Sequence, residues 1–149
     1  MSIEKDIHQI RKFRNEHHKL VVNLIYTGNK LTEGVRDIVK PYDITSQQFN
    51  VLRILRGSDR PLTTLQIRER MLDKMSDTSR IVERLLVKGL VSKTVNPHDK
   101  RLVDVTITAA GLRLSKKLDK LDEAIEALAA NLTVKEAKLL NALLDKLRG

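Results

Sequence analysis

The sequence predicts a mainly α-helical fold with a small β-wing, that is, a winged helix-turn-helix flanked by N- and C-terminal dimerisation helices. The prediction depends on residues 72–108, where a helix is followed by two short strands joined by a charged turn. Apolar stripes at helical spacing on both sides of that region predict further helices. We expect a single domain over 1–149, with a winged helix at 41–108 and dimerisation helices at 1–40 and 109–149.

The predicted helix at 75–89 has a basic face and an apolar face. Arg80, Arg84 and Lys88 recur at intervals of four, which places them on one side of a helix. The other side carries residues that can anchor it to a core, Ile81, Val82, Leu85 and Leu86. Gly89 predicts the end of the helix, because glycine readily adopts the positive φ found there.

Short polar side chains stand at the start of this helix, at Ser76, Asp77 and Thr78. Such side chains can approach base edges closely, and the free N–H groups of a helix N-terminus favour phosphate. A basic face is most often only the solvated side of an amphipathic helix, and Asp77 and Glu83 neutralise part of this one. The polar start favours DNA binding over that alternative.

Strands are predicted at 91–95 and 103–108, the second from its strict alternation of apolar and polar residues. Asn96 and Pro97 begin the turn between them, because proline cannot continue a strand ladder. The tip consists of four polar residues, His98, Asp99, Lys100 and Arg101.

Asp99 and Arg101 lie two residues apart across this tight turn and can pair. Pairing would hold the guanidinium extended, which lowers the entropy lost when it enters a narrow minor groove. A solvated charged tip is the alternative, but the basic helix just before it favours a wing that contacts DNA. We therefore predict DNA contacts from His98, Lys100 and Arg101, with Asp99 orienting the wing.

Three further helices are predicted from capping boxes, in which a threonine and a residue three positions later satisfy each other's backbone donors. They begin at Thr45, Thr63 and Thr133. Outside these, an apolar seam predicts helices at 3–27 and 30–39, broken at Gly28, and Leu and Ile positions predict one long helix at 109–131. A helix of about 25 residues is about 37 Å long. A second copy of the chain is the simplest cover for its apolar stripe.

Composition agrees with a nucleic-acid partner and excludes several classes of site. The chain has 28 Lys and Arg against 19 Asp and Glu, a formal charge of +9, which attracts polyanions. Aromatic residues make up only 3%, too few for the stacking platforms that bind single strands. The absence of cysteine excludes disulfides, thiolate metal sites and thiol redox sensing.

The sequence shows neither a catalytic constellation nor a metal-ligand set, and we expect no enzyme activity, no metal and no cofactor. No apolar run approaches the roughly 20 residues of a membrane span, and the first residues lack the apolar core of a signal peptide. We expect a soluble cytoplasmic protein with no membrane partner.

The order of elements and three motifs resemble the MarR family of winged-helix transcriptional regulators. The first motif is Ile44-Thr-x-x-Gln48-Phe49-x-Val51-Leu52, and the second runs from Ser76 to Arg84 and on to Lys88-Gly-Leu-Val91. The third, and the most specific, is Asn96-Pro-His-Asp-Lys-Arg101 followed by Val105-Thr-Ile-Thr-x-x-Gly111.

The resemblance implies a homodimer joined through its terminal helices, with each winged helix on one half of a palindromic double-stranded operator. It implies that Ser76, Asp77, Thr78, Arg80 and Arg84 face the major groove, and that Arg101, steadied by Asp99, enters the minor groove. Many members repress nearby genes and release DNA when a small, often aromatic, acid binds. Asp77 departs from the family, because it places a carboxylate at a base-reading position. A carboxylate repels phosphate but can accept a hydrogen bond from the N4 amino group of cytosine.

These observations predict a homodimeric, ligand-responsive repressor that binds double-stranded DNA in a sequence-specific way. The alternative is a basic winged-helix protein that coats DNA non-specifically or binds a protein partner. The ratio of operator affinity to random-duplex affinity separates the two, because specific binders usually reach about a thousandfold or more.

Overall fold

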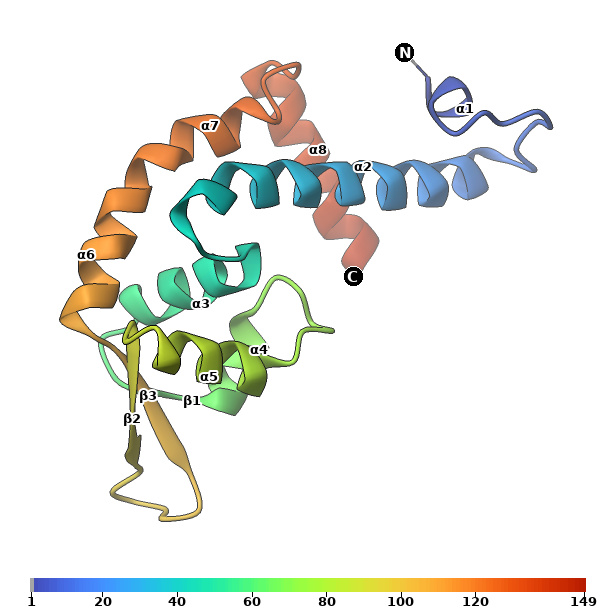
Figure 1. The fold of residues 1–149 in the computed structure, drawn as a ribbon. Helices are drawn as coiled ribbons and strands as arrows, with labels where there is room; N and C mark the ends of the chain where they lie inside the picture. Colours follow the sequence, from blue (N-terminus) through green and yellow to red (C-terminus); the bar gives the residue numbers. More distant parts are fainter. Residues whose placement is uncertain (1) are drawn as a thin grey trace.

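A long helix, α2, runs across one end of the molecule, and the winged-helix region lies beneath it with its hairpin pointing away (Figure 1). The computed structural model describes residues 2–149. In chain order the helices are α1 (Ile3–Asp6), α2 (Glu16–Val39), η1 (Lys40–Tyr42), α3 (Ser46–Arg56), α4 (Thr64–Arg70), α5 (Thr78–Val87), α6 (Ala109–Lys117), η2 (Leu118–Leu121), α7 (Asp122–Ala127) and α8 (Val134–Arg148). The strands are β1 (Leu62–Thr63), β2 (Val91–Val95) and β3 (Val103–Ile107).

The hydrophobic core lies between α3, α4, α5 and the sheet. Its fully buried side chains come from every one of these elements and include Val51, Leu52, Leu62, Ile67, Val82, Leu85 and Val105. Burying one such Leu or Ile contributes about 1.5–3 kcal/mol. This core fixes α5 and the hairpin relative to each other, and therefore fixes the two parts of any DNA-binding surface.

The sheet is antiparallel, with strand order β1-β3-β2. Val91 pairs with Ile107 and Val95 with Val103, which confirms the predicted hairpin, although its second strand ends one residue earlier than predicted. The two-residue strand β1 was not predicted, because it is too short to show alternation. Its Leu62 pairs with Val105 and joins the start of α4 to the hairpin.

All three predicted capping boxes are present. Thr45, Thr63 and Thr133 each accept a hydrogen bond from the backbone N–H three residues later, at 3.1, 3.3 and 3.3 Å. The side chains of Gln48, Gln66 and Glu136 accept from the threonine backbone in return, at 3.1, 3.0 and 2.8 Å. These boxes begin α3, α4 and α8.

The N-terminal helix predicted at 3–27 is not continuous, because only residues 16–27 of its second half belong to α2. Only α1 forms at its start, Ser2 precedes it without a side-chain cap, and the chain then leaves the helix with His8 at a φ of 52°. Ile10 is 99% exposed, so the apolar seam does not reach this segment. Like charges at Arg11 and Arg14 would crowd one helical face, whereas Asn15 accepts a hydrogen bond from His18 N at 2.9 Å and begins α2 instead.

The predicted break at Gly28 is wrong, because α2 continues through it. A glycine inside a helix costs only about 1 kcal/mol relative to alanine, which a 24-residue helix can absorb. Farther along, Gly34 lets α7 approach closely, since a Cβ there would lie 2.7 Å from a Leu128 methyl group.

The helix predicted at 109–131 is divided by η2 into α6 and α7. Together they form a curved arm that leads from the hairpin back to α2 (Figure 1). Two ion pairs hold the arm to α3, from Arg53 to Asp122 at 2.8 Å and from Arg56 to Asp119 at 2.5 Å.

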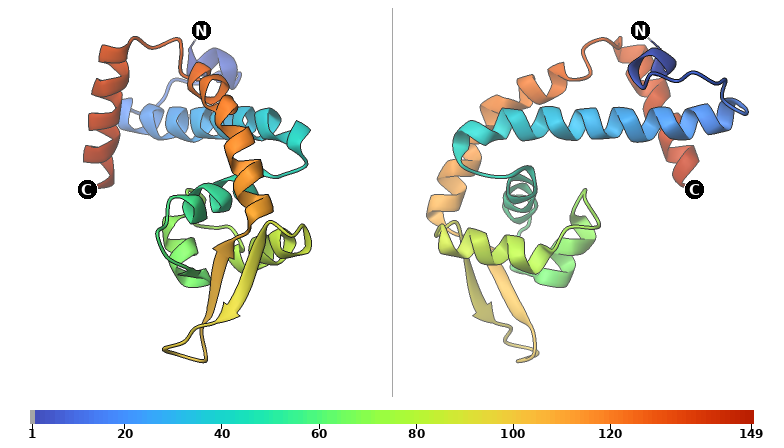
Figure 2. Two further views of the ribbon diagram at one scale, coloured as in Figure 1. Left: turned by 90° about the vertical axis from the view of Figure 1, so that its left-hand side faces the viewer. Right: turned by 45° about the vertical axis from the view of Figure 1, so that its right-hand side comes forward.

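The last helix, α8, stands apart from the rest of the chain (Figure 2, left). None of its residues is buried, and its apolar side chains Val134, Leu139, Leu140, Leu143 and Leu147 are exposed. Leu20, Val21 and Ile25 of α2 are exposed as well. Within residues 2–149, no helix is both long enough and apolar enough to cross a membrane.

Candidate nucleic-acid interface

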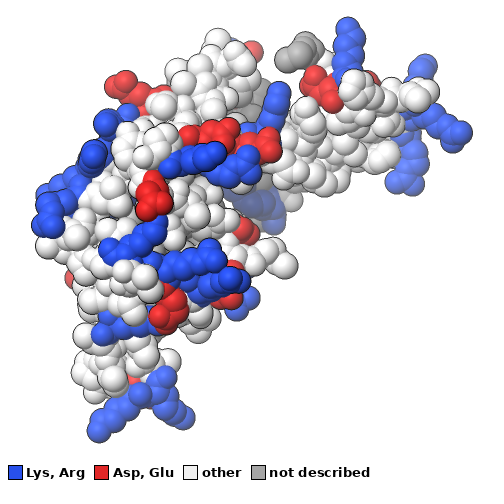
Figure 3. Space-filling view, in the orientation of Figure 1, with Lys and Arg blue, Asp and Glu red and all other residues white. Residues whose placement is uncertain are grey.

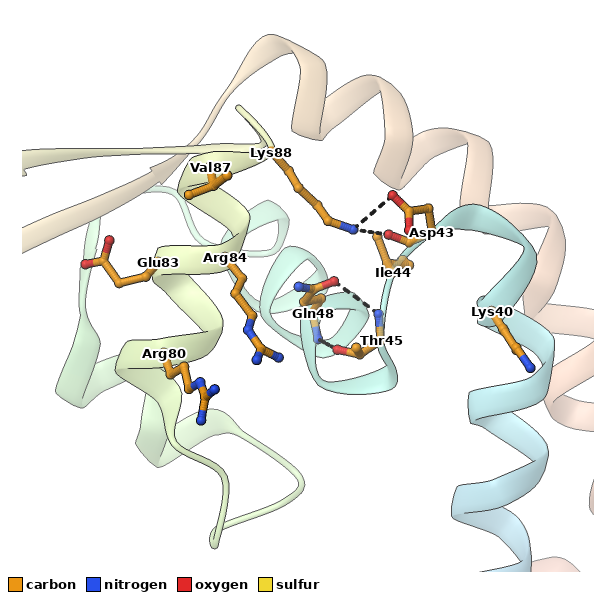
Figure 4. A pocket seen from close by; sticks show the side chains of 10 residues that line it. All are labelled: Lys40, Asp43, Ile44, Thr45, Gln48, Arg80, Glu83, Arg84, Val87 and Lys88. Carbon is orange, nitrogen blue, oxygen red and sulfur yellow. Dashed lines mark hydrogen bonds and ion pairs between the residues drawn. The ribbon is translucent and has the colours of Figure 1, made fainter.

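Helix α5 presents two arginines away from the core. Its inward side is fixed by Val82 and Leu85, which are fully buried. Arg80 and Arg84 extend from the opposite side into an open groove (Figure 4). The predicted basic face is therefore confirmed for these two arginines and the predicted anchored face for Val82 and Leu85, whereas Leu86, also predicted to anchor the helix, is exposed.

Both ends of α5 are capped by side-chain or backbone hydrogen bonds. Asp77 accepts a hydrogen bond from the Arg80 backbone N–H at 3.1 Å, so the helix begins at Thr78 rather than at residue 75 as predicted. At the other end Gly89 has a φ of 68°, as predicted. Its N–H donates to Leu86 O at 2.9 Å and the next N–H donates to Leu85 O at 3.0 Å, which is a Schellman motif.

The predicted polar start of this helix is mostly engaged within the protein. Thr78 is only 4% exposed, so its hydroxyl faces the interior and cannot reach a base. Ser76 lies before the helix and donates to Asp73 Oδ2 at 2.7 Å; this hydrogen bond is the main cause that lowers the pKa of Asp73. Asp77 is the helix cap, which explains an acidic residue at this position on a basic surface.

Lys88 differs most from its predicted role as a DNA contact. Its ammonium group donates to the backbone carbonyl of Asp43 and, at 3.2 Å, to the Asp43 carboxylate (Figure 4). Asp43 occupies the left-handed conformation at the end of η1, with a φ of 55°. Lys88 thus ties the end of α5 to the α2–α3 junction and is not free to bind phosphate. No sequence signal indicates this pair, because its members are 45 residues apart.

The wing tip is ordered by hydrogen bonds within the turn. Asn96 Oδ1 accepts from the backbone N–H groups of His98 and Asp99 at 2.9 and 3.0 Å. Asp99 Oδ1 then accepts from Arg101 N at 3.0 Å and from Arg101 Nε at 3.2 Å, which confirms the predicted pair. The Arg101 side chain remains 92% exposed. His98 and Lys100 are exposed beside it.

Positive side chains gather at the free end of the hairpin and around the α5 region (Figure 3). One further lysine in this region, Lys93 of β2, pairs with Glu83 of α5, a link between two elements that no local sequence pattern indicates. This ion pair neutralises the acidic residue on the outward face of α5. Arg80 and Arg84 take part in none of the ion pairs found among residues 2–149, and Arg101 at the wing tip remains exposed.

The groove beside α5 has a volume of about 680 Å³ and lies between that helix and the α2–α3 junction. It is lined by Lys40, Asp43, Ile44, Thr45, Gln48, Arg80, Glu83, Arg84, Val87 and Lys88. No group of three or more His, Asp or Glu residues that could hold a metal occurs in the part of the chain from Ser2 to Gly149.

A profile of the MarR family matches residues 42–102, which span the helix-turn-helix, β2 and the turn of the hairpin. The multiple antibiotic resistance protein MarR of Escherichia coli is 30% identical over 126 residues, which cover 83% of this chain and 87% of MarR. The HTH-type transcriptional repressor IacR of Pseudomonas putida is 26% identical over 117 residues, covering 78% of this chain and 70% of IacR.

Solved structures of E. coli MarR share the whole fold. A MarR mutant complexed with operator DNA superposes with a TM-score of 0.81 at 27% identity, over 92% of this chain and 99% of that chain. The apo form of wild-type MarR superposes with a TM-score of 0.68 at 30% identity, over 84% of this chain and 94% of that chain. The sequence and the fold agree, and the chain belongs to the MarR family of winged-helix transcriptional regulators.

Proposed function

We propose that this protein is a homodimeric repressor that acts in the cytoplasm and binds a palindromic double-stranded operator in a sequence-specific way. One observation carries the proposal: Arg80 and Arg84 lie on the outward face of a rigid helix, beside a wing whose Arg101 is held extended by Asp99. Helix α5 would read base edges in the major groove, and Arg101 would enter the adjacent minor groove.

The overall conformation supports this proposal. The chain superposes better on operator-bound MarR than on apo MarR, with TM-scores of 0.81 and 0.68. This likeness to a relative solved with operator DNA supports the same kind of partner for this chain.

The exposed apolar side chains of α8 and α2 support a dimer. A monomeric soluble protein rarely leaves a whole apolar helix face open to water. In a homodimer, the α8 and α2 faces of one copy would cover those of its partner. A dimer would double the charge of +9 and present two winged helices to the two halves of an operator.

The groove beside α5 supports regulation by a small molecule. It places four cationic side chains, Lys40, Arg80, Arg84 and Lys88, around a partly apolar lining, and of these Lys88 is paired with Asp43. We propose that a small organic acid binds there and weakens operator binding. Titration of the operator complex with small aromatic acids such as benzoate tests this, and the proposal fails if no acid in the panel releases DNA.

Selection of binding sites from random duplexes at a fixed salt concentration tests the main proposal. We expect a palindromic consensus bound about a thousandfold or more tightly than random duplex. Enrichment of no sequence, with equal affinity for all duplexes, would instead favour a non-specific architectural protein. Binding to no duplex would favour a winged helix that contacts a protein partner.

A further inference from the structure

One acidic side chain is buried beneath the wing. Asp104 lies in β3, the central strand of the sheet, and is 7% exposed. Among residues 2–149 it is the one Asp, Glu, Lys or Arg that is buried. Burying a carboxylate is costly unless hydrogen bonds compensate it. A hydrophobic residue would be easier to accommodate at this position, so the polar contacts of Asp104 indicate its role.

Both carboxylate oxygens of Asp104 accept hydrogen bonds from the amide nitrogen of Asn96, at 2.9 and 3.1 Å. An ionised carboxylate can only accept. The Asn96 side chain must therefore turn its NH₂ group toward β3 and its oxygen toward the hairpin tip. Asp104 thus determines which end of the amide faces the turn.

The oriented Asn96 oxygen holds the turn itself. It accepts from the N–H groups of His98 and Asp99, and Asp99 in turn accepts from Arg101 N and Nε. A continuous series of hydrogen bonds therefore runs from the buried carboxylate through Asn96 and the turn backbone to the exposed guanidinium of Arg101.

We propose that Asp104 is a positioning residue for DNA binding, which acts through Asn96 to hold the wing turn in the conformation that presents Arg101. This inference rests on the proposed function, because it requires Arg101 to contact DNA. Asp104 itself is buried and touches no ligand. Its effect on affinity should therefore depend on the tip side chains that the turn presents, above all Arg101, which distinguishes positioning from a general contribution to the fold.

A double-mutant cycle tests this dependence. Operator affinity is measured for Asp104→Leu, Arg101→Ala and the double variant, with Thr106→Val as the control because Thr106 is exposed on the same strand. We expect Asp104→Leu to weaken binding about 2- to 12-fold. This is the cost of ordering one side chain, here Arg101, when the protein binds DNA. In the Arg101→Ala background the same change should cost much less, because most of the contact that Asp104 positions is already lost, and Thr106→Val should bind as wild type.

The conservative variant Asp104→Asn gives a second measurement. Its amide oxygen can still accept from Asn96, so its affinity should lie within about twofold of wild type. If Asp104→Leu does not fold, as judged by circular dichroism, Asn96→Ala replaces it in the cycle with the same expectation.

Two results would overturn the inference. In one, Asp104→Leu binds the operator as tightly as wild type. In the other, its loss of affinity is equal with and without Arg101. Both results are read on a wild-type protein that prefers its operator over random duplex. If the wild-type protein shows no such preference, the proposed function is rejected, whatever the Asp104 variants do.

Discussion

The carboxylate of Asp99 holds Arg101 by two hydrogen bonds from the same residue, one from the backbone N–H at 3.0 Å and one from Nε at 3.2 Å. The first fixes the turn and the second fixes the direction of the side chain. The rest of the guanidinium remains exposed and available to a ligand. Removing Asp99 would therefore have two opposite effects on operator affinity: loss of its negative charge would strengthen binding, and loss of its hold on Arg101 would weaken it.

The first prediction concerns this pair. Arg101→Ala should weaken operator binding most among the wing variants, because it removes both a charge and a minor-groove contact. Asp99→Ala raises the net charge, so simple electrostatics predicts tighter binding. We expect weaker binding instead, by about 0.5–1.5 kcal/mol, because Arg101 must be ordered anew on each encounter.

Duplex titration at fixed salt measures both variants. The loss for Asp99→Ala should be greatest on operators with A·T-rich flanks, where the minor groove is narrow. A gain in affinity for Asp99→Ala would show that the wing acts only as a positive patch.

The second prediction concerns Arg84 and Lys88, which the sequence placed on one face and the structure assigns to different tasks. Arg84→Ala should lose discrimination at particular base pairs by about 1–3 kcal/mol, the size of a lost base contact. Lys88→Ala should lower thermal stability, because it breaks the link to Asp43.

The salt dependence of binding distinguishes these roles. A lysine that contacts phosphate contributes about 0.9 to the slope of log affinity against log salt. Because Lys88 is bound to Asp43, we expect Lys88→Ala to leave that slope unchanged. A slope reduced by about one would mean that Lys88 leaves Asp43 and contacts DNA in the complex.

The third prediction concerns assembly. Leu143 lies in the middle of the exposed apolar face of α8 and is 53% exposed in the single chain. Leu143→Asp should convert the dimer to a monomer, because it would place a charge in the apolar interface. Asn141→Asp, a polar change on the same helix, should leave the dimer intact. Sedimentation at micromolar concentration measures both, and a folded monomer for the wild-type chain would disprove the proposed assembly.

The fourth prediction concerns Gly111, which lies against the chain segment that connects α5 to β2. A Cβ on Gly111 would lie 2.1 Å from the Leu90 carbonyl oxygen, which is itself held by a hydrogen bond from Thr108 N at 3.1 Å. Gly111→Ala should therefore lower the free energy of unfolding by about 1–3 kcal/mol.

Gly28 offers the matched control, because a Cβ there meets nothing within 4 Å and the residue is helical. Gly28→Ala should raise stability by about 0.5–1 kcal/mol. Chemical denaturation of the two variants checks both signs, and equal effects would contradict the close contact at Gly111.

The fifth prediction concerns the pH dependence of stability. The Arg56 guanidinium donates two hydrogen bonds to Asp119, at 2.5 and 2.9 Å, and these lower the pKa of Asp119 from its ordinary value of 3.8. A carboxyl whose pKa is lowered by folding stabilises the native state above the unfolded pKa, and this contribution is lost as the pH falls through the folded value. Asp119→Asn should thus lower the melting temperature at pH 7.

The difference between Asp119→Asn and wild type should shrink below a pH of about 3.8. Asp59→Asn, in the exposed turn before β1, serves as the control for loss of one negative charge. A pH-independent difference for Asp119→Asn would mean that the side chain contributes through packing alone.

The local features of this protein were determined by the sequence. The three capping boxes, the positive φ of Gly89, the hairpin and the pair of Asp99 with Arg101 all depend on residues a few positions apart. Short-range hydrogen bonds and backbone preferences are properties of the local sequence, and the structure confirms each of these predictions. The helix boundaries were predicted less well: the N-terminal helix begins at Glu16 where Asn15 caps it, α2 continues through Gly28, and η2 divides the helix predicted at 109–131.

Only the tertiary structure decided which polar residues are free to contact a ligand. The side chains of Thr78, Lys88 and Asp104 are polar in the sequence, yet folding buries the first and third and ties the second to Asp43. These outcomes depend on contacts between segments that lie far apart along the chain or in neighbouring elements of the core. Burial and pairing are properties of the packed structure, and local pattern alone cannot show which charges remain exposed to bind DNA.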